Sequence, residues 1–402
     1  MFHSKALLSL ILISSAVVDA SPLSRSTGKA TLSFATRINE SGTLNIVDKD
    51  RARAQAFKNA GHLGKRDGSI SVTNAAMTYT AQVGVGNPAT EYTLLIDTGS
   101  SNTWIGASKT YSQTSTSQDT GNTVSVSYGS GSFSGEEWTD TVTLGSGLVI
   151  EDQSIGVASS ATGFAGVDGI LGIGPVGLTA DTVSNTDTVP TVTDNLLSQG
   201  TISEEVIGIY YAPASESSST GELTFGGYDK SMITSSVRYT SLTTSSPASN
   251  YWGINQSISY GGTTIQSTTS GIVDTGTTLI LIASDAFQQY QSATGGTLDD
   301  TTGLLTITST QYSDLQSLSF NIGDTSYDLS PNAQIWPRSL NSAIGGSSGS
   351  IYLVVSDLGS SSGSGLDFID GYTFLERYYS VFDATNGRVG FATTAYTDAT
   401  IN

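Results

Sequence analysis

The stretch Leu94-Leu95-Ile96-Asp97-Thr98-Gly99-Ser100 ends in a tetrapeptide that returns 177 positions later as Asp274-Thr275-Gly276-Thr277. Apolar residues lead into both copies, because Ile272-Val273 stands before the second aspartate. Each carboxylate is therefore expected at the end of a buried strand, at the point where the chain turns. Two similar half-chains would each supply one acid.

Length and composition are those of a large, mostly β protein. The chain has 402 residues, which is enough for two domains with sizeable cores. It contains 45 glycines and only 13% charged residues, and it uses Ser, Thr, Tyr and Val heavily. This composition is typical of many short strands joined by turns.

The chain contains no cysteine, and its two histidines, His3 and His62, lie in segments that we expect to be removed. A mature chain without either residue type cannot carry out Ser-His-Asp or Cys-His catalysis. Zinc sites built on thiolate or imidazole ligands are excluded as well. Carboxylates remain the main catalytic candidates, and we expect neither a metal nor another cofactor.

Residues 1–20 have the pattern of a secretory signal peptide. His3 and Lys5 precede an apolar stretch at 6–18, and the small Ala20 stands at the expected cleavage point. The alternative is a membrane anchor, but the stretch is too short to span a bilayer and no apolar tail closes the chain. We therefore expect a secreted, extracellular protein with no membrane partner.

Charge divides the remaining sequence. Residues 21–66 carry a net charge of +6, whereas the chain from residue 67 onward carries a net charge of −25. The pair Lys65-Arg66 before Asp67-Gly68-Ser69 is typical of a dibasic processing site in an exposed turn, and the alternative is a chance basic pair in a loop. We interpret 21–66 as a basic propeptide.

A basic propeptide would block an acidic cleft through ion pairs. Lys58 and Lys65 are the candidates to meet the paired aspartates. Protonation of the carboxylates would weaken this pairing, so acid should favour release of the propeptide. The mature chain has no basic patch, and we expect no nucleic-acid partner.

Two adjacent carboxylates have a specific chemistry. Like charges about 3 Å apart cannot both ionise at low cost, so such a pair shares one proton. One member can then activate a water while the other protonates the carbonyl oxygen of an amide. The neighbouring residues fit this chemistry. Gly99 and Gly276 allow close backbone approach, and the hydroxyls of Ser100 and Thr277 can hydrogen-bond the outer carboxylate oxygens. Thr98 and Thr275 can tie the two loops together.

Four motifs in order resemble those of the pepsin-like aspartic proteases, and within that family the polyporopepsin-type fungal acid proteases. They lie at 94–104, 128–133, 168–172 and 274–278, and the resemblance runs from about Ser71 to the C-terminus. It implies a mainly β fold in which two β-barrel-like lobes flank a long substrate cleft. Each lobe would contribute one catalytic aspartate, Asp97 or Asp274.

The resemblance also implies roles for residues around the cleft. A hairpin that closes over the substrate would carry a tyrosine, which a tryptophan hydrogen-bonds, and apolar side chains would line a pocket beside the scissile bond. The matching residues are Tyr128, Gly129 and Ser130 on the hairpin, Trp104 beside it, and Leu95 and Ile170 in the pocket. From the residues alone, the alternation around a glycine turn predicts a hairpin. The alternative to a hairpin over the substrate is an ordinary hairpin whose tyrosine covers the core. The implied substrate is a polypeptide with bulky apolar residues at the cut.

One segment departs from the family pattern. Where pepsin-like enzymes usually have an apolar pair before a glycine and an aspartate, this chain has Ile369-Asp370-Gly371-Tyr372. The role of Asp370 stays open at this point. The family's usual disulfides are also absent, which leaves the chemistry unaffected.

The domain boundaries follow from these observations. We expect a signal peptide at 1–20, a propeptide at 21–66, an N-terminal lobe at 67–240 and a C-terminal lobe at 241–402. Helices are predicted at 190–200 and at 284–294, the second with Ser284 as its cap. Asn255-Gln256-Ser257 is an acceptor sequence for N-glycosylation, so Asn255 is a possible glycan site. We expect a monomer.

Three classes of function fit a pair of carboxylates. The first is an acid endopeptidase that acts on polypeptides through Asp97 and Asp274 and is inhibited by its own propeptide. The second is a catalytically silent binding or inhibitor protein on the same fold, which would typically have lost an aspartate or Tyr128. The third is a glycosidase, but the two symmetric Asp-Thr-Gly copies do not provide the different environments that its acid and base need.

Overall fold

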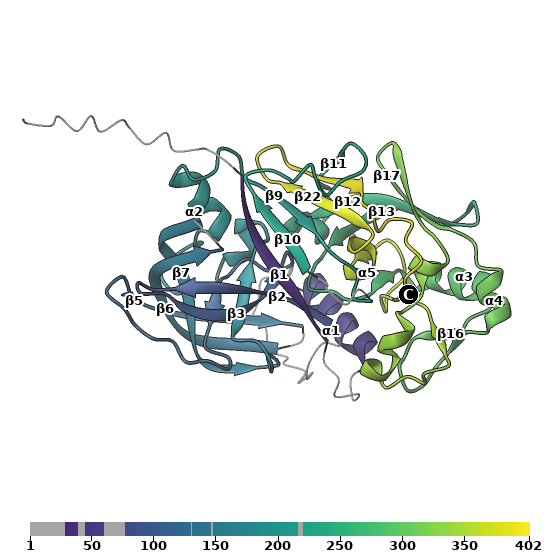
Figure 1. Ribbon diagram of the computed structural model, residues 1–402, viewed down its shortest axis with the longest axis horizontal. Coiled ribbons are helices and arrows are strands. Elements are labelled where there is room, and N and C mark those ends of the chain that lie inside the picture. Colours follow the sequence, from purple (N-terminus) through teal and green to yellow (C-terminus); the bar gives the residue numbers. More distant parts are fainter. Residues whose placement is uncertain (1–28, 39–44, 60–76, 130, 146–147, 216–219) are drawn as a thin grey trace, which may run out of the picture.

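The computed structural model describes residues 29–38, 45–59, 77–129, 131–145, 148–215 and 220–402. The expected signal peptide at 1–20, the pair Lys65-Arg66 and Ser130 lie outside these described residues. The molecule is mainly β and has two lobes, which Figure 1 shows in blue on the left and in green on the right. The expectation of a bilobal, mainly β protein is confirmed.

Long antiparallel strands build the first lobe. Strands β5, β6 and β7 form a meander, and Tyr128 lies opposite Gly131 at the tip of the β5–β6 hairpin. The elements of this part are β2 (Met77–Val85), β3 (Thr90–Asp97), β4 (Trp104–Ile105), β5 (Gln118–Tyr128), β6 (Gly131–Leu144), β7 (Leu148–Thr162), β8 (Gly169–Gly172), η1 (Val176–Thr179), α2 (Val192–Ser198), β9 (Val206–Tyr210) and β10 (Thr220–Phe225).

A seven-stranded sheet, in the order β18-β17-β12-β13-β21-β14-β20, forms the centre of the second lobe. Short helices and a three-stranded sheet cover it. The elements are β12 (Gly253–Tyr260), β13 (Thr263–Val273), β14 (Ile280–Ile282), α3 (Ser284–Thr294), β15 (Thr297–Leu298), β16 (Leu305–Ile307), α4 (Ser309–Ser313), β17 (Leu318–Ile322), β18 (Thr325–Leu329), η3 (Asn332–Gln334), η4 (Arg338–Ile344), β19 (Ile351–Tyr352), β20 (Val355–Asp357), β21 (Phe368–Asp370) and α5 (Tyr372–Leu375).

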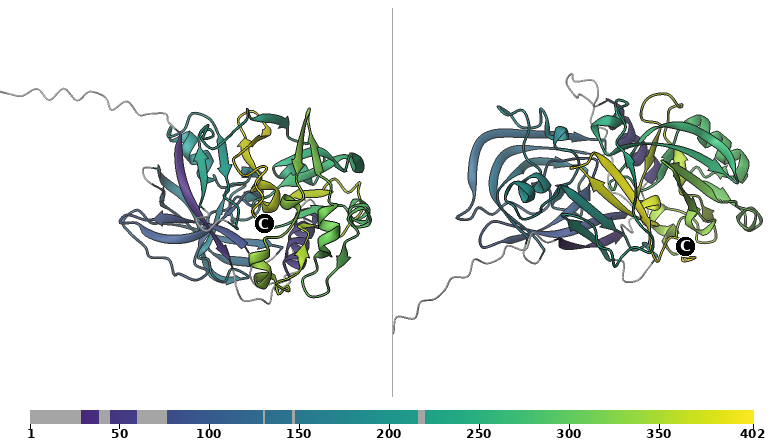
Figure 2. Two further views of the ribbon diagram at one scale, coloured as in Figure 1. Left: turned by 45° about the vertical axis from the view of Figure 1, so that its right-hand side comes forward. Right: turned by 90° about the horizontal axis from the view of Figure 1, so that it is seen from above.

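A single sheet of 13 strands joins the first lobe to the end of the chain. Its order is β11-β23-β22-β9-β10-β1-β2-β3-β8-β4-β7-β6-β5. In Figure 2 its teal and yellow strands lie between the blue and green lobes. The strands that complete it are β11 (Arg238–Ser241), which precedes η2 (Ala248–Asn250), together with β22 (Tyr378–Asp383) and β23 (Arg388–Thr393).

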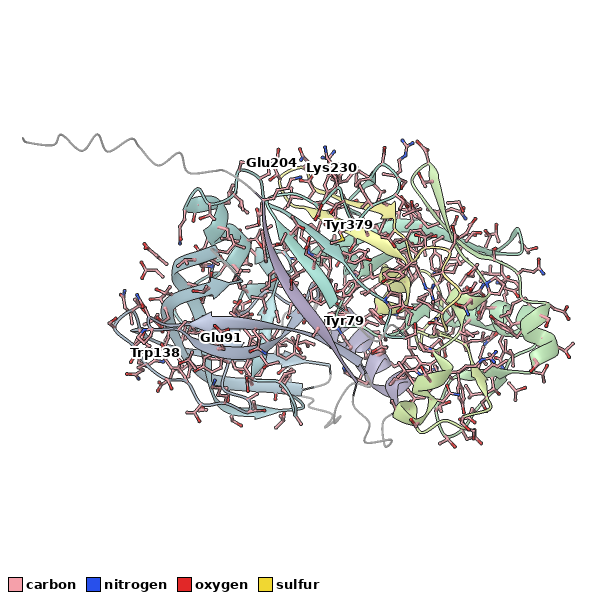
Figure 3. All side chains as sticks on the ribbon, viewed as in Figure 1. Tyr79, Glu91, Trp138, Glu204, Lys230 and Tyr379 are labelled. Atoms are coloured by element: carbon pink, nitrogen blue, oxygen red, sulfur yellow. The ribbon has the colours of Figure 1, made fainter. Side chains whose placement is uncertain are left out.

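The basic segment 21–66, called the leader from here on, contributes two elements to the fold. Strand β1 (Ala30–Ile38) pairs with β10 on one side and with β2 on the other. Its Phe34 packs edge-on against Tyr79 and Tyr211, with ring centroids 5.5 and 5.1 Å apart. Figure 3 shows Tyr79 in the middle of the molecule, between the lobes. Helix α1 (Ile46–Asn59) then follows, and the Asn45 side chain accepts a hydrogen bond from Asp48 N at its start.

The two halves repeat one arrangement around their aspartates. Strand β3 runs parallel to β8, and β8 runs antiparallel to β4, which in turn runs parallel to β7. In the second half β13, β21, β14 and β20 are related in the same way. The duplicated Asp-Thr-Gly of the sequence thus reflects a duplicated strand topology.

Both predicted helices are present, but one cap differs. Helix α2 begins after Thr191, which forms a capping box with Asp194. Helix α3 has the predicted bounds, yet Ala283 is its cap residue and Ser284 is already helical. The Ser284 hydroxyl donates to Asp357 Oδ1 at 2.6 Å instead. The capping prediction was wrong because a carboxylate from a distant strand attracts this hydroxyl.

None of the described helices combines the length and the apolar character that are needed to cross a bilayer.

We predict that Phe382→Ala destabilises the protein by about 3–5 kcal/mol, because it removes a fully buried ring from the large sheet. Phe382 lies opposite Ile207 in β9, and its ring centroid is 5.3 Å from that of Trp252. Urea unfolding of the full chain measures the effect. Leu197→Ala is the control, because Leu197 is 37% exposed and should change stability by under about 0.5 kcal/mol. Equal effects of both substitutions would contradict the prediction.

Candidate active site

The two aspartates lie at the ends of their strands and are completely buried. Asp97 ends β3 and Asp274 follows β13, and the exposed fraction of each is 0%. Asp97 pairs with Gly172 in the parallel strand β8. Asp274 N donates to the carbonyl of Asp370, the last residue of β21. The expected position at the end of a buried strand is therefore where the structure places both carboxylates.

Each carboxylate accepts the same pair of hydrogen bonds from its own loop. Ser100 Oγ donates to Asp97 Oδ2 at 2.6 Å, and Thr277 Oγ1 donates to Asp274 Oδ2 at 2.5 Å. The backbone N–H of Gly99 donates to Asp97 Oδ1, and that of Gly276 to Asp274 Oδ1. The hydroxyls hold both Oδ2 atoms, and both Oδ1 atoms face the opposite loop at the centre of the site. 

The threonines tie the two loops together across the lobe boundary. Thr98 N donates to Thr275 Oγ1 and Thr275 N donates to Thr98 Oγ1, both at 3.0 Å. The Thr98 hydroxyl donates to Val273 O, and the Thr275 hydroxyl donates to Ile96 O, both at 3.3 Å. This reciprocal set fixes one aspartate relative to the other.

Glycine is required at two positions because each loop touches the opposite carboxylate. A Cβ atom on Gly99 would stand 2.6 Å from Asp274 Oδ1, and a Cβ atom on Gly276 would stand 2.7 Å from Asp97 Oδ1. Any side chain at either position would push the carboxylates apart.

Arg53 of the leader helix α1 lies between the two carboxylates. Its Nη2 is 2.5 Å from Asp97 Oδ1 and 2.9 Å from Asp274 Oδ1, and its Nε donates to Asp274 Oδ2 at 2.7 Å. The sequence prediction named Lys58 or Lys65 for this place. Lys58 instead donates to Ser360 Oγ, and Lys65 lies outside the described residues. An arginine suits the position because its planar fork can contact two carboxylates at once.

The charges of this cluster shift the pKa values of its members. Burial opposes the charge on Arg53, but the two aspartates outweigh it and raise the pKa of Arg53 above its usual range. Burial would also raise the pKa of Asp274. The charge of Arg53 and the hydrogen bonds from Arg53, Thr277 and Gly276 outweigh burial and hold the pKa of Asp274 below its ordinary value. The ion pair is therefore strongest where the aspartates are ionised.

Other residues of α1 fill the space around Arg53. Asp50 Oδ2 accepts hydrogen bonds from the backbone N–H groups of Thr278 and Leu279, at 3.0 and 2.8 Å. Burial raises the pKa of Asp50 to about 6, although Lys49 and the hydrogen bond from Leu279 oppose the rise. Phe57 packs against Tyr251 with ring centroids 4.7 Å apart. Neither Asp50 nor Arg53 was singled out from the sequence. The available signal was the net positive charge of residues 21–66.

The β5–β6 hairpin covers the same helix. A Cβ atom on Gly129 would stand 2.3 Å from Arg53 Cα, so the backbone of the hairpin tip lies directly against α1. The Tyr128 ring contacts Phe164 edge-on at 5.4 Å, and Trp104 contacts Phe164 at 4.8 Å. Tyr128 Oη and Trp104 Nε1 make no hydrogen bond of standard geometry, although Trp104 is close enough to lower the pKa of Tyr128, which burial raises.

An apolar cluster brings the predicted pocket residues together. Leu95, Tyr128 and Ile170 pack with Phe164 and Trp104, and Ile170 is 1% exposed. A cavity of about 50 Å³ lies beside the contact between the hairpin tip and α1, and Arg53, Phe57, Ser100 and Tyr128 are among its lining residues. Asn255 lies away from this site on an exposed position of β12, where its Oδ1 accepts a hydrogen bond from Ser270. In the described ranges, no three metal-ligating side chains gather into a possible metal site.

Comparison with known proteins places this geometry in a family. The model of the family "Eukaryotic aspartyl protease" matches residues 78–394. Polyporopepsin of Irpex lacteus is 62% identical over 83% of this chain and 99% of its own length. Cathepsin E of Rattus norvegicus is 32% identical over 79% of this chain and 80% of its own.

A solved structure agrees with the sequence relatives. The crystal structure of aspartic proteinase from Irpex lacteus superposes with a TM-score of 0.81 at 54% identity, and the match covers 93% of this chain and 100% of that one. The fold is thus the bilobal pepsin-like fold that the sequence motifs predicted. This chain therefore belongs to the pepsin-like aspartic protease family and is an aspartic endopeptidase.

Proposed function

We propose that the enzyme hydrolyses peptide bonds with a water activated between Asp97 and Asp274. The observation that carries this proposal is the position of Arg53 Nη2, within hydrogen-bond distance of Oδ1 of both aspartates. A water at that point would contact both inner oxygens once the leader has left. The hydrogen bonds from Ser100 and Thr277 hold the outer oxygens and leave the inner oxygens for the reaction.

The reaction uses one shared proton. The ionised aspartate takes a proton from the water as the water oxygen attacks the amide carbon, while the protonated aspartate gives its proton to the carbonyl oxygen. The tetrahedral intermediate then breaks at the C–N bond, and the departing nitrogen receives a proton from the first aspartate. The second aspartate regains its proton from the intermediate's hydroxyl. No covalent enzyme intermediate is needed.

We further propose a preference for bulky apolar residues beside the cleaved bond. The cluster of Leu95, Tyr128, Phe164 and Ile170 supports this, because it presents apolar side chains next to the Asp97 loop. An extended peptide would be held mainly through backbone hydrogen bonds under the β5–β6 hairpin. Since the paired carboxyls of an aspartic protease share one proton and titrate in the acid range, activity is expected between roughly pH 2 and 5.

Asp97→Asn and Asp274→Asn should each lower turnover by at least about a thousandfold, because either change removes one partner of the shared proton. The measurement is cleavage of an unfolded protein at about pH 3 to 4 by the acid-processed enzyme. Urea unfolding of each variant serves as the control for an intact fold. A statine-type transition-state mimic should block the wild-type enzyme. Retained turnover in either variant would overturn the dyad assignment.

We also propose that residues 21–66 act as the inhibitor of the enzyme's own precursor. Arg53 forms ion pairs with both aspartates, and α1 packs against the tip of the hairpin. The pKa of Asp274 is lowered while Arg53 is bound, so this ion pair stabilises the closed precursor above about pH 4 and is lost as pH falls through the lowered pKa. Acid should therefore open the precursor.

Replacing Arg53 by Met should open the precursor at a higher pH, because loss of one partner of a buried ion pair costs about 3–5 kcal/mol. The measurement is the pH midpoint at which the full chain, in the Asp97→Asn background, binds a fluorescent statine-type inhibitor. Arg51→Met is the matched control from the same helix. Arg51 pairs with Asp357 and its side chain is 36% exposed, so its loss should cost under about 1 kcal/mol. Equal midpoints for Arg53→Met and Arg51→Met would argue against an inhibitory role of Arg53.

The remaining expectations complete the proposal. We propose that residues 1–20 direct secretion, that Lys65-Arg66 marks the processing site, and that the lobes meet near residues 240 and 241. Asn255 stays a candidate for glycosylation, and we expect a monomeric enzyme. The alternative of a catalytically silent binding protein gains no support from the relatives.

A further inference from the structure

Asp370 is a buried carboxyl group that the proposed chemistry does not use. It is 0% exposed and ends β21, where it lies opposite Val273, the residue before Asp274. Its Oδ1 accepts a hydrogen bond from Gln256 Nε2 at 3.0 Å. Gln256, in β12, is also 0% exposed. A buried carboxyl that interacts with a neutral amide, and not with a cation, requires an explanation.

Two atoms of this pair have no hydrogen-bond partner among the residues that the structure describes. They are Asp370 Oδ2 and Gln256 Oε1, the second oxygen of the carboxyl and the oxygen of the amide. Both are acceptors while Asp370 is ionised, so neither can satisfy the other. A proton on Oδ2 would turn it into a donor for the amide oxygen. The acid and the amide would then close a ring of two hydrogen bonds, which leaves no side-chain polar atom of the pair unpaired.

The first half of the chain has an apolar pair at the same two positions. Register shows this, because Leu171 lies opposite Ile96, the residue before Asp97, just as Asp370 lies opposite Val273. Leu95 and Ile272 each lie two residues before an aspartate, and they pair with Thr80 and Gly253. Val83 lies three residues after Thr80, and Gln256 lies three residues after Gly253. Val83 and Leu171 are both 0% exposed. One half therefore buries two aliphatic side chains where the other buries an amide and a carboxyl.

The segment that begins at Asp370 holds the second aspartate loop through its backbone. Asp274 N donates to Asp370 O, and Tyr372 N donates to Thr277 O at 2.8 Å. Thr373 N donates to Thr278 O at 3.0 Å. A change in the position of Asp370 would thus be transmitted directly to the loop that carries Asp274.

Few titratable groups face Asp370 from the elements packed against β21. Strands β13 and β14, which pair with β21, carry no titratable side chain. The titratable groups on the described elements next to them are Asp274 after β13, Tyr260 at the end of β12, Asp357 in β20 next to β14, and Tyr372 in α5. Asp274 and Asp357 pair with arginines of the leader, and the Tyr372 hydroxyl donates to Glu376. Burial raises the pKa of Asp370 to about 7, and the Gln256 hydrogen bond opposes the rise.

We propose that Asp370 and Gln256 form a carboxylic acid–amide pair that positions the Asp274 loop while Asp370 is protonated and releases it when Asp370 loses its proton. Asp370 is a positioning residue, because it acts through Asp274 and does not meet the substrate. The inference rests on the proposed function only in assigning Asp274 to catalysis. The pair would confine the active conformation to the acid range in which the dyad works.

The sign of the pH effect follows from linkage. An unfolded chain loses the Asp370 proton near about pH 4, whereas the folded chain keeps it to a pKa of about 7. Between these values the folded state binds one more proton, so the unfolding equilibrium constant should rise about tenfold per pH unit from this group alone. Above the folded pKa the contribution no longer changes.

The test measures how many protons the full chain releases when it unfolds, with Asp97→Asn as background to prevent self-cleavage. Two variants keep the pair filled without a titrating group: Asp370→Asn, and the double variant Asp370→Leu with Gln256→Val, which copies the pair of the first half. Urea unfolding is measured from pH 4 to 7. The slope of the logarithm of the unfolding constant against pH should fall by about one in both variants. An unchanged slope in variants that fold would overturn the proposal.

Asp367→Asn is the matched control for a purely structural role. Asp367 lies three residues earlier, and the hydrogen bonds from Thr269, Gly363 and Ser364 outweigh burial and lower its pKa. Its loss should reduce stability at every pH from 4 to 7 and leave the slope unchanged. A slope change in this control equal to that of Asp370→Asn would count against the assignment.

A second measurement tests the link to Asp274 in the active, acid-processed enzyme. Asp370→Asn should keep kcat at pH 3 to 4 within about threefold and should lose activity at least about tenfold more slowly during incubation at pH 7. Unchanged survival at pH 7 would contradict the release of the Asp274 loop. Turnover that persists in Asp274→Asn would instead refute the proposed function, while the proton count of unfolding would still decide whether Asp370 is protonated.

Discussion

The structure depends on holding two carboxylates together at a point that helix α1 closes off from solvent. Asp97 and Asp274 are both 0% exposed, and glycines bring each loop against the opposite carboxylate. Two buried like charges are costly, so a positive charge or a shared proton must accompany them. The reciprocal bonds of Thr98 and Thr275 keep the pair together, and the duplicated strand topology supplies one loop from each half.

The chain meets this requirement with Arg53 of helix α1. The guanidinium contacts both carboxylates at once, and the helix that carries it also supplies Asp50 to the backbone N–H groups of Thr278 and Leu279. Strand β1 pairs on both edges within the large sheet, so the leader is bound through backbone pairing as well as through charge. Because Arg stays charged at all relevant pH values, only the aspartates can respond to acid.

Protonation also favours the burial of carboxyl groups other than Asp97 and Asp274. Burial raises the pKa of Glu137, in the first lobe, to about 7, although its hydrogen bond from Ser154 opposes the rise. Asp370 shows the same behaviour beneath the second aspartate loop. These carboxyls are neutral where the enzyme is expected to work, and each makes the folded state bind protons that the unfolded chain releases. This burial pattern is therefore expected to lower stability toward neutral pH.

The sequence by itself determined the family, the enzyme class and the type of fold. Local order was enough for this, because the duplicated Asp-Thr-Gly, its apolar approach strands and the alternation before Gly129 are contiguous patterns. Only the tertiary structure decided which distant groups meet. Arg53 reaches the aspartates and Lys58 does not, because helix α1 directs them to different partners, and Ser284 donates to Asp357 and caps no helix. The partner of Asp370 was equally hidden, since a hydrogen bond between residues 114 positions apart depends on how two strands pack.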